Sequence, residues 1–101
     1  MPEDKLTPKE RKRLVLEVAV QHARKSGIHQ VMRSSVASAA GVGAGTVSLY
    51  FNTMGQLRRA IARYGMTHND PEILSQLLTD PQFKKKLSPD HRKIALQHLA
   101  G

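Results

Sequence analysis

One stretch constrains the fold of this 101-residue chain more than any other: RSSVASAAGVGAGTVSLYFN, residues 33–52. Its first half carries an apolar stripe at helical spacing, formed by Val36, Ala37 and Ala40. Gly41 follows the stripe, and glycine accepts the left-handed backbone that a tight turn after a helix requires. A second apolar face comes next, formed by Val47 and Phe51. The pattern predicts a helix-turn-helix, with one helix over 33–40 and another over 46–52.

The rest of the chain also has the signals of helices. Thr7, Pro8 and Glu10 form a capping box with proline at the first helical position, and Gly27 marks the end of that helix. Later helices begin at pairs of a capping residue and proline, namely Asp70-Pro71, Asp80-Pro81 and Ser88-Pro89. The expected helices outside the motif are 7–26, 55–66, 71–79, 81–87 and 89–100.

No stretch alternates apolar and polar residues as a strand would, so the predicted fold class is all-α. We expect a helical bundle that contains the helix-turn-helix and a short C-terminal helical extension. A chain of this length forms a single domain, 1–101. Within it we expect a helix-turn-helix core over 7–66 and C-terminal helices over 67–101.

The charge distribution favours a polyanionic partner. The formal net charge is +8 and the isoelectric point is about 10.3. No Asp or Glu occurs between Val18 and Asn69, whereas that span holds six Lys and Arg residues. A surface that is merely solvated usually mixes both signs, so a span of one sign around the motif indicates nucleic acid.

Several classes of function have no support in the sequence. Cysteine is absent, which excludes disulfides and thiolate metal sites. The five histidines follow no metal-ligand spacing, and no phosphate-binding loop or nucleophile motif is present. We therefore expect no enzyme activity, no metal and no cofactor. No signal peptide or membrane-spanning stretch is recognisable, so we expect a cytoplasmic protein.

Residues 14–61 resemble the DNA-binding domain of the tetracycline-repressor (TetR) family. VLEVAVQHARKSG is similar to that family's alanine-rich first helix, which ends in glycine. SSVASAAGVGAGTVSLYFNTMGQLRRAI is similar to its helix-turn-helix, including the Tyr50-Phe51 pair. The chain departs from the family pattern at Gly43-Ala44, at Ser48 and at Thr53-Met54-Gly55. It also lacks the family's large ligand-binding domain, so no small-molecule inducer is expected.

The resemblance implies a bacterial, plasmid or phage transcription regulator, in most cases a repressor. Such a protein binds double-stranded DNA at a palindromic operator as a homodimer. The dimer requires an apolar surface, which we expect in the C-terminal segment. The candidate interface residues are Ile73, Leu74, Leu77, Leu78, Ile94, Leu96 and Leu99.

Helix-turn-helix proteins place the N-terminal part of the second helix in the major groove. The residues expected there, next to the bases, are Ala44, Gly45, Thr46, Val47, Ser48 and Tyr50. The residues expected to contact phosphates are Lys12, Arg13, Arg33, Ser34, Ser35, Gly43, Asn52, Thr53, Arg58 and Arg59. The second helix carries no Lys or Arg, so it lacks the bidentate contact that arginine makes to guanine. Hydroxyls, methyl groups and shape must then contribute more.

Two other functions remain open on the sequence. A nonspecific or architectural DNA-binding protein would use the basic surface and read few bases. A protein-interaction module would keep the helix-turn-helix shape without binding DNA, although the acid-free span argues against it. Phe51 is expected in the core, whereas Tyr50 could equally pack in the core or contact DNA. Lys84–Lys86 are expected to form a solvated face rather than a DNA contact.

Overall fold

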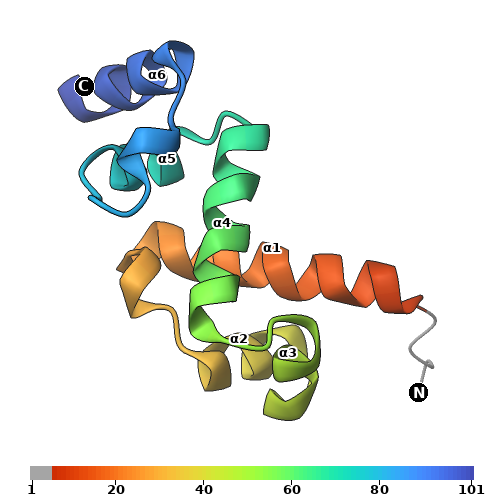
Figure 1. Cartoon of the computed structure of the whole chain (residues 1–101). Helices are drawn as coiled ribbons and strands as arrows, with labels where there is room; N and C mark the ends of the chain where they lie inside the picture. Colours follow the sequence, from red (N-terminus) through yellow and green to blue (C-terminus); the bar gives the residue numbers. More distant parts are fainter. Residues whose placement is uncertain (1–5) are drawn as a thin grey trace.

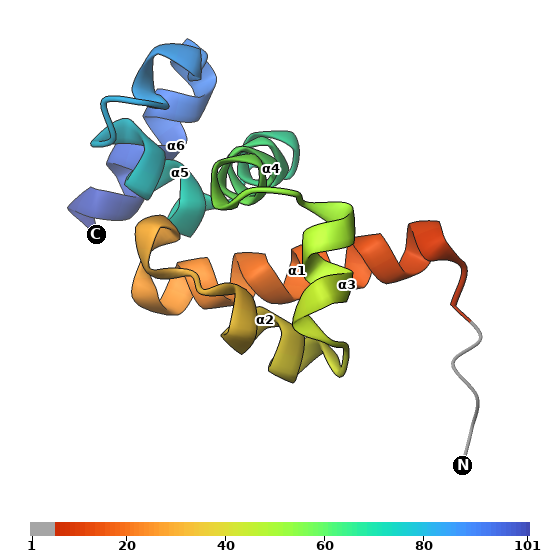
Figure 2. The same cartoon turned by 60° about the horizontal axis from the view of Figure 1, so that its bottom comes forward.

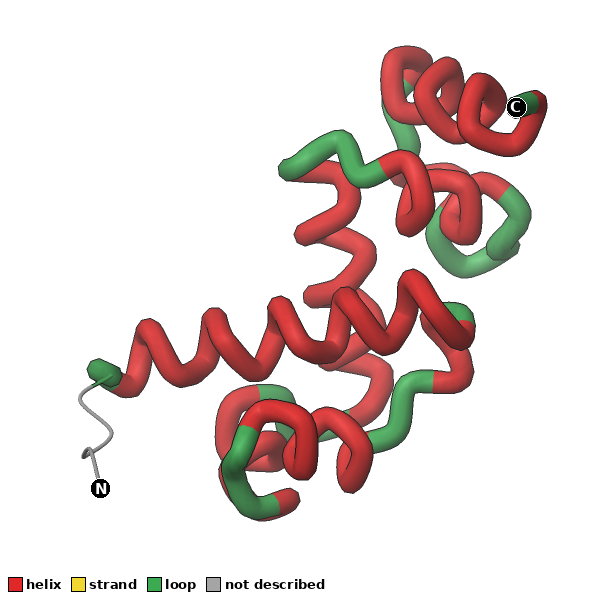
Figure 3. The backbone as a smooth tube through the Cα atoms, turned by 180° about the vertical axis from the view of Figure 1, so that it is seen from behind, coloured by secondary structure: helices red, strands yellow, loops and turns green. Residues whose placement is uncertain are grey.

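The computed structural model describes residues 6–101, and this part of the chain contains no β-strand. The all-α prediction is therefore confirmed. Figure 3 shows helical segments joined by loops. The elements are α1 (Pro8–Ser26), the 3-10 turn η1 (Ile28–Gln30), α2 (Arg33–Ala40), α3 (Ala44–Tyr50), α4 (Met54–Thr67), α5 (Pro71–Leu78), the 3-10 turn η2 (Lys84–Lys86) and α6 (Pro89–Ala100).

Two long helices cross at the centre of an elongated molecule whose extents are 46 × 23 × 20 Å. α1 and α4 pack against each other, with α2 and α3 at one end of α4 and α5 and α6 at the other (Figure 1). Figure 2 brings α2 and α3 forward and shows them beside α1. The helix-turn-helix and the C-terminal helices therefore lie at opposite ends of the molecule.

The start of α1 is fixed by the predicted capping box. The Thr7 hydroxyl accepts from the Glu10 backbone N–H at 3.1 Å, and the Thr7 N–H donates to the Glu10 carboxylate at 2.9 Å. The backbone hydrogen bond from Thr7, followed by the contact with its side chain, holds the pKa of Glu10 below its usual value. The predicted end at Gly27 is also confirmed, with φ at +100°.

The core is mainly aliphatic and runs through both ends of the molecule. α1 supplies Val15, Ala19, Val20 and Ala23, which are at most 1% exposed. The helix-turn-helix adds Val36, Ala37, Val47 and Phe51, and α4 adds Leu57, Ile61 and Ala62. The C-terminal segment closes the core with Ile73, Leu74, Leu77, Phe83, Leu87 and Ala95.

α4 and α5 approach closely because Gly65 has no side chain. A Cβ at this position would collide with the Ile73 side chain of α5. Gly65 and Ile73 are both buried.

The predicted helix over 81–87 is wrong. This segment consists of a turn followed by η2, because the backbone folds tightly around Asp80. The Asp80 carbonyl accepts from the N–H groups of Phe83 and Lys84 at 3.1 and 2.8 Å, and the Asp80 carboxylate accepts from the N–H of Gln82 at 2.8 Å. α3 begins two residues earlier than predicted and ends two residues earlier, which is within the usual uncertainty of helix ends.

None of the helices in residues 6–101 is both long enough and apolar enough to cross a lipid bilayer.

Candidate nucleic-acid interface

α2 and α3 are joined by the tight turn that the sequence predicts. Gly41 has φ +72° and ψ +30°, the left-handed conformation in which glycine avoids the strain of a side chain. Its N–H donates to the Ser38 carbonyl at 3.2 Å, and the Val42 N–H donates to the Ala37 carbonyl at 3.0 Å. These two bonds end α2 and direct the chain into α3.

One face of α3 is not covered by any other part of residues 6–101. Of the predicted base-contact residues, Ala44 and Gly45 are exposed, and Thr46, Ser48 and Tyr50 are half-buried. Tyr50 also packs partly against the core, while Phe51 is 6% exposed and belongs to it, as expected. Ala44, Gly45 and Ser48 form a surface of small side chains without charge.

The predicted contact between Val47 and a base is wrong. Its side chain is fully buried, so it packs inside the helix-turn-helix and cannot contact a base from this position. Leu49, which the sequence reasoning passed over, is 78% exposed. The helical spacing could have predicted this exposure. Leu49 is two positions after the core residue Val47, so it lies about 200° away from it around the helix.

Arg33 connects the start of α2 to the loop after α3. Its Nη2 donates to the Asn52 carbonyl at 3.5 Å, a long contact that holds the guanidinium beside that loop. Its Nε is buried, and no hydrogen-bond partner for it exists among the described residues. The guanidinium has five N–H donors, and the Nη groups, rather than the buried Nε, are the ones that could bind an external anion.

The other predicted phosphate-contact residues differ in accessibility, and Arg59 lines a small cavity with Phe83 and Lys86 of the C-terminal segment. Ser34, Ser35, Gly43, Asn52, Thr53 and Arg59 are exposed, whereas Arg58 is half-buried. Nε of Arg58 is buried and, in the described part of the chain, has no hydrogen-bond partner. The Thr53 hydroxyl already caps α4, since it accepts from the Gln56 N–H at 3.0 Å.

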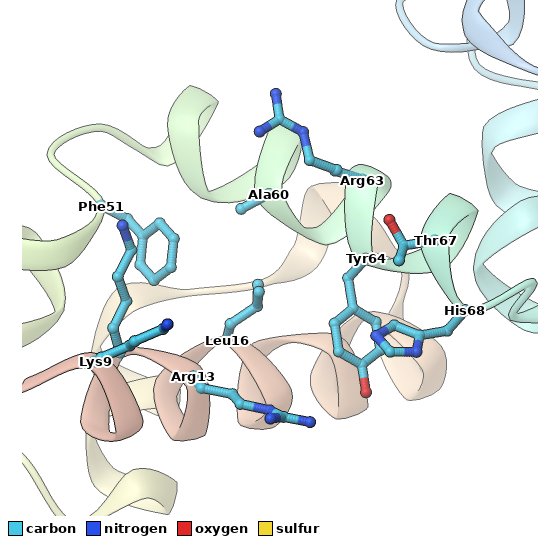
Figure 4. A pocket seen from close by; sticks show the side chains of 10 residues that line it. Lys9, Arg13, Leu16, Phe51, Ala60, Arg63, Tyr64, Thr67 and His68 are labelled. Carbon is cyan, nitrogen blue, oxygen red and sulfur yellow. The ribbon is translucent and has the colours of Figure 1, made fainter. Parts of the chain in front are cut away.

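The N-terminal half of α1 adds cations beside the end of α3. Lys12 lies with its Nζ 5.4 Å from the centroid of the Phe51 ring, an arrangement that permits a cation–π attraction. Arg13 is exposed and pairs with Glu17 at 3.4 Å. Both line a groove of about 400 Å³ between α1 and α4 (Figure 4). Its other lining residues are Lys9, Leu16, Phe51, Ala60, Arg63, Tyr64, Thr67 and His68.

Two other groups of cations lie away from this interface. Arg24, in the acid-free span, is paired with Asp70 of the C-terminal segment. Lys84–Lys86 are exposed in η2, which belongs to the end of the molecule opposite α3 (Figure 1). The cations that contact residues directly after α3 are Lys12 of α1 and Arg33 of α2.

Three histidines contact polar groups, and His29 and His98 reach groups that are far from them in the sequence. His29 Nε2 lies 2.6 Å from the Asp80 carboxylate, and His98 Nε2 lies 3.4 Å from that of Glu72. His91 Nδ1 accepts from the Ser88 N–H at 3.3 Å and so completes the cap of α6. Among residues 6–101, no three His, Cys, Asp or Glu side chains group closely enough to hold a metal ion.

The predicted dimer residues divide into buried and exposed sets. Ile73, Leu74 and Leu77 are fully buried in the chain's own core, so they are not available to a partner, which corrects that part of the prediction. Leu78 and Ile94 are half-buried. Leu96 and Leu99, one helical turn apart on α6, are 58% and 57% exposed.

Comparisons with protein-family models, curated proteins and solved structures found no match to this chain.

Proposed function

We propose that this chain is a sequence-specific double-stranded DNA-binding protein that regulates transcription, as a repressor of the TetR-like kind. The observation that carries the proposal is the exposed outer face of α3, with cations of α1 and α2 beside its C-terminal end. Lys12 of α1 lies 5.4 Å from the centroid of the Phe51 ring, and Arg33 of α2 donates to the Asn52 carbonyl. This is the arrangement that helix-turn-helix docking requires, with one helix able to enter the major groove and cations positioned for the phosphates.

Base recognition would come from the outer face of α3. Ala44 and Gly45 bring the helix backbone near the base edges, and the Thr46 and Ser48 hydroxyls can donate to or accept from either kind of base. Tyr50 offers its hydroxyl from the end of the helix. Affinity would come mainly from cations outside α3, and it should fall steeply with salt.

Two exposed leucines on α6 support binding as a homodimer. Leu96 and Leu99 are exposed on α6, at the end of the molecule opposite α3 (Figure 1). A two-fold contact through α6 would bury these leucines and leave both copies of α3 accessible to DNA. Such a dimer would read a palindromic operator whose half-sites lie about one turn of DNA apart, or a multiple of that distance.

Selection of bound fragments from random double-stranded DNA at physiological salt tests the proposal. We expect the recovered fragments to share a palindromic motif. The Thr46→Ala and Ser48→Ala variants should reduce the ratio of affinities for that motif and for random DNA. Lys93→Ala, which truncates an exposed side chain on α6, should leave that ratio of affinities unchanged.

The main competing function is a nonspecific or architectural DNA-binding protein. The absence of Lys and Arg from α3 favours it, because strong guanine contacts are then missing. It predicts tight, salt-sensitive binding with no common motif among the selected fragments. Absence of DNA binding at low salt would instead support a protein-interaction module.

A further inference from the structure

Leu49 is the most exposed large hydrophobic side chain in residues 6–101, with 78% of its surface accessible. It lies in α3, a helix with no charged residue. Single exposed leucines are common on protein surfaces and need no special reason. Two further features of α3 give this leucine a specific interpretation.

The first feature is the glycine one turn before it. Gly45 and Leu49 are four residues apart, so they lie on the same face of α3. A Cβ built on Gly45 meets no atom within 4 Å, and the residue does not have a positive φ. Neither packing nor backbone geometry in this chain requires a glycine here, although glycine is a poor helix former.

The second feature is the small size of the neighbouring side chains. Ala44 and Ser48 share the outer face with Gly45, so Leu49 is the one large side chain that projects from it. An approaching surface could therefore come close to the α3 backbone and meet Leu49 first. The polar hydroxyls of α3 are half-buried beside it.

The chemistry of the major groove matches this arrangement. The 5-methyl group of thymine is the apolar group that base edges present there, and apolar side chains recognise it by contact. We infer that Leu49 is a specificity-determining residue that reads the thymine methyl group, with Gly45 leaving the space in which the base pair approaches. This inference rests on the proposed function and names the base that α3 selects.

Exchange of thymine for deoxyuridine tests the inference directly, because deoxyuridine lacks the methyl group and keeps the other groove contacts of thymine. The probe is the palindromic fragment recovered by selection, with each thymine replaced in turn. For the unmodified chain we expect about a fourfold loss of affinity at one or two thymines in each half-site, the value of one buried methyl group. Exchange at the other thymines should have no effect.

The Leu49→Ala variant should bind thymine and deoxyuridine equally well at the sensitive positions. The control is Lys93→Ala, which truncates an exposed side chain on α6 at the opposite end of the molecule and should keep the fourfold difference. Because Leu49 is exposed, the variant should unfold at the same urea concentration as the unmodified chain, so a loss of folding cannot account for the result.

Four results would overturn the inference. If a motif is recovered but no thymine responds to the exchange, Leu49 does not read a methyl group, while the proposed function stands. The same conclusion follows if Leu49→Ala keeps the fourfold difference, or if it abolishes self-association in the absence of DNA, which would assign Leu49 to a protein contact. If selection recovers no motif, the proposed function fails, and the inference fails with it.

Discussion

Arg24 and Asp70 join α1 to α5 through a single carboxylate oxygen. Nε and Nη2 of Arg24 donate to Oδ2 of Asp70 at 2.8 and 2.5 Å. The other oxygen, Oδ1, accepts from the backbone N–H groups of Glu72 and Ile73 at 3.1 and 3.2 Å and so caps α5. Asp70, 7% exposed, thus fixes the C-terminal segment on the helix-turn-helix half of the molecule.

Substitution of Asp70 should separate these two roles. Asp70→Ala removes both the cap and the ion pair, and it should lower the free energy of unfolding by about 2 kcal/mol, roughly half from each. Asp70→Asn keeps an oxygen for the cap and loses the charge, so we expect about 1 kcal/mol. Urea denaturation followed by circular dichroism measures both values. Equal stability of the two variants would show that the cap contributes nothing.

Gly65→Ala should destabilise the chain, because the added Cβ would collide with the Ile73 side chain. Overpacking of this kind costs about 1–3 kcal/mol. Gly55→Ala is the matched control, since the nearest atom to its Cβ would be at 3.5 Å on the flexible Arg59 side chain. The control should be neutral or stabilising by a few tenths of a kcal/mol. Thermal unfolding of the two variants compares them, and a stable Gly65→Ala variant would contradict the packing argument.

Arg33→Ala should weaken binding to operator and random DNA by the same factor. A phosphate contact carries no sequence information, so its loss lowers the slope of log K against log salt by about one. Fluorescence anisotropy at several salt concentrations gives the slope. Lys93→Ala, which removes an exposed cation from α6, should leave it unchanged. If the loss of affinity were confined to operator DNA, Arg33 would contact a base rather than a phosphate.

Gly45→Ala should leave the free energy of unfolding unchanged or raise it by a few tenths of a kcal/mol, since the new methyl group meets no neighbour and alanine favours the helix. The same methyl group should weaken operator binding by about tenfold, the scale of one disturbed base contact. Gly55→Ala, also at the second position of its helix, serves as the control for stability. Unchanged operator affinity would remove Gly45 from the interface.

Leu96→Glu combined with Leu99→Glu should convert a dimer to a monomer, because the carboxylates would have to be buried at the contact. Sedimentation velocity at high protein concentration measures the state. Met32→Glu places one carboxylate on a side chain that is 60% exposed at the other end of the molecule, and it should not change the oligomeric state. If the unmodified chain is a monomer, both free and on DNA, the proposed dimer is wrong.

The sequence by itself determined the helices whose ends are set by local interactions. Thr7 and Glu10 cap α1, Gly27 ends it, and Gly41 makes the turn after α2. These signals act over a few residues, so they could be predicted without knowledge of the fold. The helix predicted over 81–87 was wrong because several local hydrogen bonds to Asp80 form a tight turn there instead.

Only the tertiary structure decided which apolar side chains remain accessible. Ile73 and Leu96 look alike in the sequence, yet one is buried against Gly65 of α4 and the other is exposed on α6. In α3, Val47 is buried and Leu49 is exposed, although both are apolar. Burial depends on which helix faces meet across long separations in the chain, and the pairing of Arg24 with Asp70 depends on the same packing.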